Sequence, residues 1–193
     1  MKHYLRIGAV VLLALVLLRL ATVNLESAPP IWWDEGWTMS VARNWIERGF
    51  YGRLLEGEPA QPGPEAHLTV TALIALSFRL FGVGVWQART VGLIFTLGAL
   101  VVMYFLSKRL YSKRIAVATL AVLFFMSPRP AFHPFLMGRQ VMGEMPMVFY
   151  LLSGYFLLLL SLQRSKWFIL AAIPLWALAL DTKLQPIPFW FLS

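Results

Sequence analysis

The sequence predicts an all-α membrane protein, a polytopic bundle of transmembrane helices with interfacial helices in its first extracytoplasmic loop. Of 193 residues, 59% are hydrophobic and 13% are charged, whereas a soluble domain is about half apolar and about a quarter charged. The apolar residues also fall into runs near the roughly 20 residues that a membrane-spanning helix needs. The mean hydropathy of +0.69 argues against a soluble nucleic-acid binder, despite the net charge of +8. No nucleic-acid partner is therefore expected.

The first apolar run predicts a transmembrane helix over Tyr4–Val23. Lys2 and Arg6 precede its apolar part, Ile7–Leu18, and a basic start is also typical of a signal peptide. No small-residue cleavage site follows, so we expect an uncleaved helix with its N-terminus in the cytoplasm.

Five later apolar segments are candidates for further spans: Ala66–Phe81, Trp86–Leu106, Ile115–Ser127, Met145–Leu162 and Trp167–Leu180. The first has about 16 residues, which rise only about 24 Å as a helix, and the core of a bilayer is about 30 Å thick. We therefore expect it to lie in the outer interface. Ile115–Ser127 and Trp167–Leu180 are also short for a full crossing.

This choice makes the topology obey the positive-inside rule. It places six basic residues in the cytoplasm: Lys108, Arg109, Lys113, Arg114, Arg164 and Lys166. All nine acids then fall on the outer side or at the outer end of a helix, which suggests a site on that face.

The predicted organisation is a single membrane domain over residues 1–193. Its first outer loop covers residues 24–85, its second covers residues 128–144, and a sixth span begins near Gln185. Because the chain stops inside that apolar segment, we expect it to be the N-terminal part of a longer protein.

The first outer loop predicts an interfacial helix from Glu35 to Arg48, closed by Gly49. Apolar side chains recur every four residues along it: Trp33, Trp37, Val41 and Trp45. A stripe rich in Trp suits a helix in the interface, because indole prefers the headgroup boundary. Glu56–Glu65 contains three prolines and is expected to be an irregular connector.

Asp34 and Glu35 form the acidic pair of greatest interest. Asp34 stands where an N-cap belongs and Glu35 in the first turn, so both favour the helix electrostatically. An oriented carboxylate beside the membrane surface can equally serve in catalysis. The two roles are compatible, and the sequence leaves both open.

Two further places combine an acid with a cation. In the second loop, Arg139 precedes Glu144, which opens the next apolar run; a headgroup anchor and a first-turn acid are the plain interpretations. After the last full apolar run, Asp181 precedes Lys183, where snorkelling is the plain interpretation. Charges at the mouth of a bundle are costly, however, and favour a polar cavity with an anionic partner.

Five motifs follow one another along the chain: Trp33-Asp34-Glu35-Gly36-Trp37, Ala42-Arg43-Asn44-Trp45 with Gly49 and Tyr51, Leu80-Phe81-Gly82 with Ala88-Arg89, Gly138-Arg139 with Glu144, and Thr182-Lys183. This ordered set resembles the C-superfamily (GT-C) integral-membrane glycosyltransferases, in particular the N-terminal portion of their protein-mannosyltransferase and aminoarabinose-transferase-like branch. The resemblance covers nearly the whole chain, in the family's order.

The resemblance implies transfer of a sugar from an undecaprenyl- or dolichyl-phosphate donor to a lipid, glycan or protein acceptor on the outer face. It implies that Asp34 and Glu35 are catalytic, and that Arg139 and Lys183 bind the donor phosphate. Glu144 matches a second-loop acid that contacts the acceptor or a metal. The implied location is a bacterial or archaeal inner membrane.

Several alternatives stay open. Polar residues at helix ends and Pro174 inside a span also suit a transporter or flippase-like bundle, and the chain alone could be an inactive truncated fragment. Asp181 stands close enough to Lys183 to neutralise it. The scattered histidines favour no metal cluster, although a divalent cation on carboxylates is compatible with the sequence. The oligomeric state is not predicted.

Overall fold

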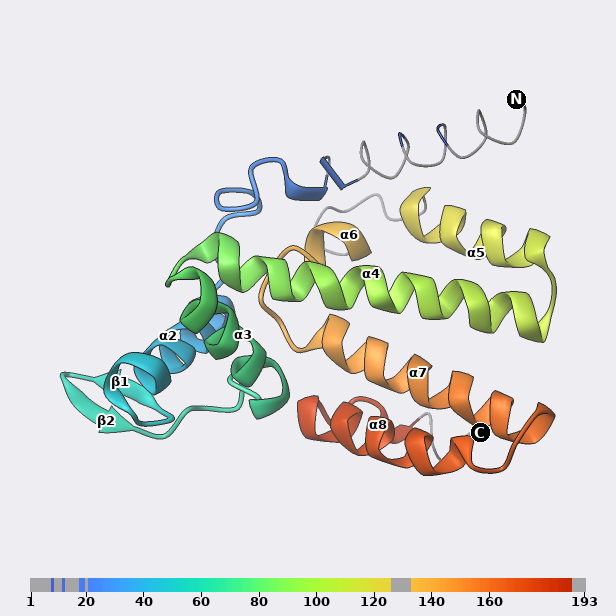
Figure 1. Cartoon of the computed structure of the whole chain (residues 1–193). Coiled ribbons are helices and arrows are strands. Elements are labelled where there is room, and N and C mark those ends of the chain that lie inside the picture. Colours follow the sequence, from blue (N-terminus) through green and yellow to red (C-terminus); the bar gives the residue numbers. More distant parts are fainter. Residues whose placement is uncertain (1–7, 9–11, 13–17, 20, 126–132, 189–193) are drawn as a thin grey trace.

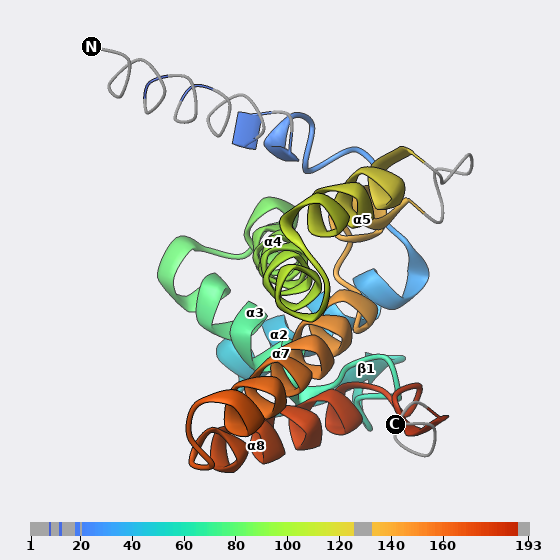
Figure 2. The same ribbon diagram turned by 90° about the vertical axis from the view of Figure 1, so that its right-hand side faces the viewer.

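Four helices run side by side in the computed structural model (Figures 1 and 2): α4 (Val85–Leu110), α5 (Lys113–Phe125), α7 (Glu144–Gln163) and α8 (Phe168–Thr182). α7 packs between α4 and α8, and α5 packs on α4. Short turns join α4 to α5 and α7 to α8, so these neighbours are antiparallel.

The structure describes residues 8, 12, 18–19, 21–125 and 133–188. The predicted first helix therefore lies largely outside the described residues. So do the start of the second outer loop and most of the predicted sixth span.

Within the described residues, two helices are long and apolar enough to span a membrane: α4 with 26 residues and α7 with 20. α5 has 13 residues and α8 has 15, which at about 1.5 Å per residue give roughly 20 and 22 Å. The predicted class of an all-α helical membrane protein is confirmed.

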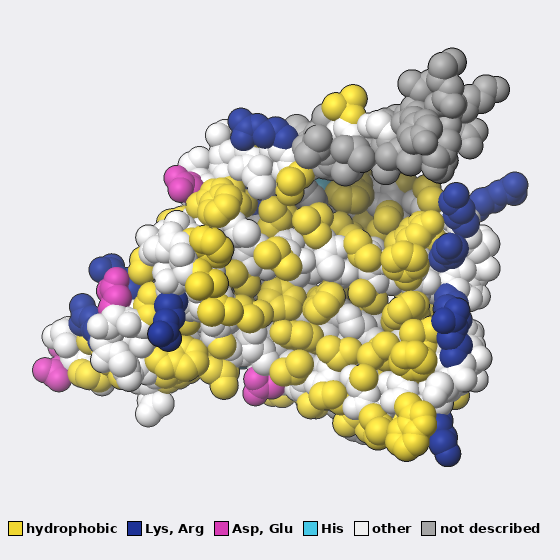
Figure 3. Space-filling model, in the orientation of Figure 1, with side chains coloured by type: hydrophobic (Ala, Val, Ile, Leu, Met, Phe, Trp, Pro, Cys, Tyr) yellow, Lys and Arg dark blue, Asp and Glu magenta, His cyan; other side chains and the backbone are white. Residues whose placement is uncertain are grey.

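The charges separate along the bundle. All six basic residues predicted for inner loops are exposed at the α4–α5 and α7–α8 turns, and Lys and Arg side chains gather on that edge of the molecule in Figure 3. We call this the basic end. The opposite end, the loop end, carries the first and second loops and all nine acids.

Five short elements build the loop end: α2 (Trp33–Arg48), β1 (Arg53–Leu55), β2 (Glu58–Ala60), α3 (Leu68–Phe81) and α6 (Pro134–Met137). α2 packs on α3, and α3 packs on α4. Buried apolar residues of these three helices form one core with Val141 of the second loop. This core fixes the first loop against the bundle.

The prediction that Glu56–Glu65 is an irregular connector is partly wrong. Within it, Glu58–Ala60 pairs with Arg53–Leu55 as an antiparallel hairpin. Glu56 and Gly57 form its two-residue turn, with φ of 54° and 91°. Positive φ at both positions is what a type I′ hairpin turn requires. The prolines did not exclude pairing, since Pro59 lies on an edge of this two-stranded sheet.

The start and the apolar stripe of α2 also differ from prediction. The helix begins at Trp33 with Trp32 as its N-cap, so Asp34 lies in the first turn instead of capping it. Trp33 is 73% exposed whereas Val41 is fully buried. The stripe is therefore divided, because α3 covers the middle of the helix while its start stays open.

Candidate functional site

The centre of the loop end is an ion pair between Glu35 of α2 and Arg89 of α4. Arg89 Nε donates to Glu35 Oε1 at 2.8 Å, and Arg89 Nη2 donates to Oε2 at 2.7 Å. Both side chains are 0% exposed. A bidentate pair of this kind has the planar geometry that Arg and carboxylate share. We call it the buried pair.

Backbone groups satisfy the rest of the buried pair. Val141 N donates to Glu35 Oε1 at 3.1 Å, and Trp32 N donates to Oε2 at 3.4 Å. Arg89 Nη1 donates to the Leu25 carbonyl at 2.8 Å. The pair thus ties together the first loop, α4 and the second loop, and both Glu35 oxygens are occupied.

Arg139 lies in the second loop near this pair. Its side chain is 7% exposed, and its Nη2 donates to the Val23 carbonyl. Its Nε is buried without a hydrogen-bond partner among the described residues. Burial, followed by the positive charge of Arg89, lowers the pKa of Arg139. A guanidinium still stays charged, so Arg139 is a buried cation whose Nε is unpartnered in the described part of the chain.

Small residues let the second loop approach α4 closely. A Cβ at Gly138 would lie 2.0 Å from Thr96 Oγ1, and one at Gly92 would lie 2.8 Å from the Gln140 carbonyl. Thr96 is fully buried, and its hydroxyl is 3.2 Å from the Gly138 carbonyl. The position of Arg139 therefore depends on glycine at both contacts.

A second polar group joins the start of α7 to the end of α8. Lys183 Nζ donates to Glu144 Oε1 at 2.6 Å, with side chains 23% and 24% exposed. The sequence pointed to Asp181 as the acid that could neutralise Lys183; the partner is instead Glu144. Glu144 Oε2 is buried and has no hydrogen bond in the described part of the chain.

His67, the N-cap of α3, completes what we call the loop-end cluster with Glu144 and Lys183. A Cβ at Gly143 would lie 2.9 Å from Lys183 Cε and 3.3 Å from His67 Cδ2, so both side chains close over this glycine. Burial, followed by the positive charge of Lys183, lowers the pKa of His67. The imidazole is therefore neutral near pH 7.

Asp34 occupies the helical turn next to the buried pair. Its side chain is half-buried, and within residues 21–125 and 133–188 it forms no ion pair. Thr38 Oγ1 lies 2.9 Å from the Asp34 carbonyl and 3.1 Å from the Glu65 carbonyl, which fixes this turn against the connector. The backbone of this turn is therefore fixed, while the Asp34 carboxylate is without an ion pair in the described part of the chain.

The structure places the predicted residues in two groups, the buried pair and the loop-end cluster, and the second loop contacts both. Val141 contacts the buried pair and Gly143 contacts the loop-end cluster. Sequence reasoning gave no role to Arg89 or His67. A charge inside an apolar run, as at Arg89, was the available signal. No group of three His, Asp or Glu able to hold a metal occurs among the described residues.

A family model described as dolichyl-phosphate-mannose-protein mannosyltransferase matches residues 64–192, about two thirds of the chain. The chain belongs to this family. It is accordingly a membrane-integral glycosyltransferase of the mannosyltransferase type. Neither the curated proteins nor the solved structures contain a match.

Some candidate residues lie inside the range that matches the mannosyltransferase family, and others lie before it. Arg89, Arg139, Glu144 and Lys183 lie within residues 64–192, whereas α2 with Asp34 precedes this range. The contact of Glu35 with Arg89 and Val141 fastens that earlier helix to the matched part.

Proposed function

We propose that this protein transfers a sugar from a polyprenyl-phosphate donor, undecaprenyl- or dolichyl-linked, to an acceptor hydroxyl at the loop end. The supporting observation is that Asp34, a carboxylate without an ion pair among the described residues, lies on a helix fastened through Glu35 to the loop that carries Arg139 and leads into Glu144. The six cations at the opposite end support an extracytoplasmic position for the loop end.

In the proposed reaction, the Asp34 carboxylate takes the proton of the acceptor hydroxyl. The acceptor oxygen forms a bond to the sugar's anomeric carbon, while the bond from that carbon to the donor phosphate oxygen breaks. The polyprenyl phosphate leaves with the electron pair. Arg139 and Lys183 stabilise its negative charge, which such partly buried cations do more strongly than exposed ones.

We propose different roles for the two other acids. Glu35 positions Asp34 and Arg139, because both its oxygens are engaged and it is fully buried. Glu144 holds Lys183 through Oε1 until the donor phosphate competes for that cation. The reaction as written needs no metal.

The test is transfer of labelled mannose from mannosyl-phosphoryl-polyprenol in membranes containing the full-length protein. Asp34→Asn should lower covalent transfer by about 10²-fold or more, the range of a lost general base. Glu58→Gln, an exposed acid on the hairpin, is the matched control and should keep full activity.

Full activity of Asp34→Asn at normal expression would overturn the assignment of the base. Movement of the labelled lipid across proteoliposomes without any covalent product would overturn transfer itself and favour a flippase.

A further inference from the structure

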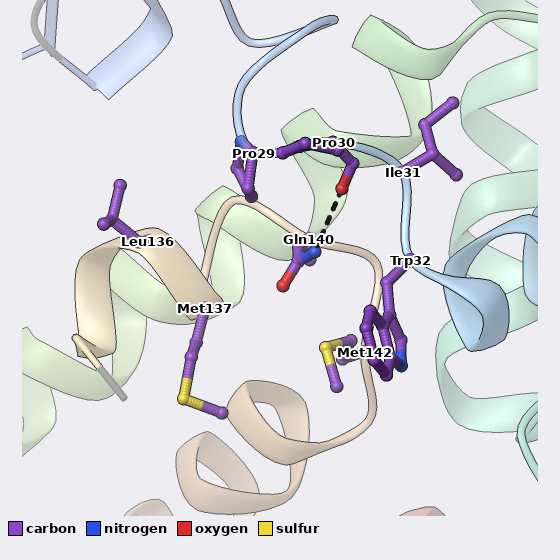
Figure 4. Close-up of a pocket in the computed structure, with 8 residues that line it drawn as sticks. All are labelled: Pro29, Pro30, Ile31, Trp32, Leu136, Met137, Gln140 and Met142. Carbon is purple, nitrogen blue, oxygen red and sulfur yellow. Dashed lines mark hydrogen bonds between the residues drawn. The ribbon is translucent and has the colours of Figure 1, made fainter. Parts of the chain in front are cut away.

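Two adjoining cavities at the loop end share Ile31 and Trp32. The first, of about 550 Å³, lies between the first-loop segment Pro29–Trp32 and the second-loop residues Leu136, Met137, Gln140 and Met142. Figure 4 shows Met142 beside Trp32, and Gln140 hydrogen-bonded to the Pro30 carbonyl at 3.3 Å. The walls are otherwise apolar, so this cavity suits a hydrocarbon chain.

The second cavity, of about 630 Å³, is an open groove along α2 with a different lining. It carries Trp33, Trp37, Arg43 and Arg48, and none of its described lining residues is acidic. Arg43 Nε forms an ion pair with Glu47 Oε2 at 2.7 Å, whereas Arg48 forms no ion pair within the described chain. Arg53, which is paired with Glu65 at 3.5 Å, lies 4.6 Å above the Trp37 ring.

The first cavity is apolar and the second is cationic with aromatic walls, and we call the two adjoining cavities together the trough. We propose that this trough holds the acceptor, and that the acceptor is a lipid with an anionic headgroup. Its chain occupies the apolar cavity and its headgroup lies between Arg43 and Arg48. Ile31 and Trp32 lie at the boundary between the two cavities, and Trp33 and Trp37 line the cationic one.

The second loop lies between this trough and Arg139, the residue proposed to bind the donor phosphate. Gln140 and Met142 face the apolar cavity, while the alternate residues Arg139 and Val141 are 7% and 1% exposed and point into the protein. Along α2, successive residues turn by about 100°, so Asp34 lies between Trp33 of the trough and the buried Glu35. In this proposal Asp34, the base, lies between the acceptor in the trough and the donor at Arg139. The acceptor role rests on the proposed function; the binding of an anionic lipid does not.

Binding is tested with the full-length protein in detergent, by tryptophan quenching with brominated phosphatidylglycerol and brominated phosphatidylcholine. We expect saturable quenching at least 10-fold tighter for phosphatidylglycerol. Arg43→Gln with Arg48→Gln should abolish this preference, and Trp33→Phe with Trp37→Phe should remove most of the saturable quenching. Lys113→Gln with Arg114→Gln, at the basic end, is the matched control and should leave both unchanged.

Equal quenching by the two lipids would contradict the proposal that the trough binds an anionic lipid. So would an undiminished preference for phosphatidylglycerol in the Arg43→Gln, Arg48→Gln variant. Labelled product is then sought in lipid and protein fractions. We expect an acidic labelled lipid whose yield falls at least 10-fold in the α2 arginine variant; product confined to protein would overturn the acceptor role. Lipid preference without any transfer would leave the trough standing and count against the proposed function.

Discussion

Glu35 and Arg89 are joined by two hydrogen bonds of 2.8 and 2.7 Å although 54 residues separate them in the chain. Neither side chain reaches solvent. The pair fastens α2, which carries the proposed base, to the helix and loop that the mannosyltransferase family model covers.

Removing one partner of this pair should strongly destabilise the protein. Arg89→Met leaves a buried carboxylate without its counter-charge, and such losses cost about 3–5 kcal/mol. Thermal unfolding of the purified protein in detergent measures the effect. Glu47→Gln, which breaks an exposed pair, should cost less than about 1 kcal/mol.

Replacing both partners should be less harmful than replacing one. Arg89→Met with Glu35→Leu removes both charges of the pair, so neither is left buried without its partner. A double variant that unfolds at a lower temperature than Arg89→Met would contradict this interpretation of the pair.

The close approach of the second loop to α4 predicts that Gly138→Ala is damaging. The added methyl would lie 2.0 Å from the buried Thr96 hydroxyl, and overpacking of this kind costs about 1–3 kcal/mol. Because Arg139 follows directly, we also expect weaker use of the donor. Unchanged melting and an unchanged KM for the lipid-linked sugar would refute the close contact.

Lys183 should matter through its charge. Lys183→Met removes a cation proposed to stabilise the leaving phosphate and should lower kcat/KM by about 10²-fold, measured with the labelled donor. Lys183→Arg keeps the charge and should lose less. Glu144→Gln, which releases Lys183 from its 2.6 Å contact, should lower the KM for the donor; an equal collapse in all three variants would indicate a structural pair only.

His67 should make stability depend on pH. Its pKa in the folded protein is lowered by burial and then by Lys183, so the unfolded chain binds the extra proton first. The stabilisation is complete above the ordinary value of about 6.5 and is lost as pH falls through the lowered pKa. Thermal melts between pH 8 and pH 5 measure this slope.

In those melts, His67→Gln should reduce the slope below that of the wild type. His133→Gln, a histidine outside the loop-end cluster, is the matched control. The same slope in the wild type and in His67→Gln would exclude His67 as the titrating group.

The helices of the bundle could be predicted because apolar runs and basic turns are local signals. The runs around α4 and α7 have the length that a bilayer imposes, and positive charge marks their turns. The hairpin at Glu56 and Gly57 was missed because its turn lacks the commoner Asn-Gly or Asp-Gly pair.

The site could be predicted only in part. Residue type and local sequence predict four site residues: Asp34, Arg139, Glu144 and Lys183. The partners of these side chains depend on tertiary contacts and could not be predicted. Glu144 stands 39 residues from Lys183 in the chain, whereas Asp181 stands two away and is not its ion-pair partner in the structure. Spacing along a chain does not reveal which helix ends meet.

The buried pair also bears on how the protein is made. Glu35 is synthesised 54 residues before Arg89, which at roughly 5–20 residues per second is about 3–11 s of translation. The carboxylate therefore already exists when the cation emerges from the ribosome. Until α2 reaches the loop end, Arg89 is an unpaired charge in an apolar helix, which is costly in a membrane.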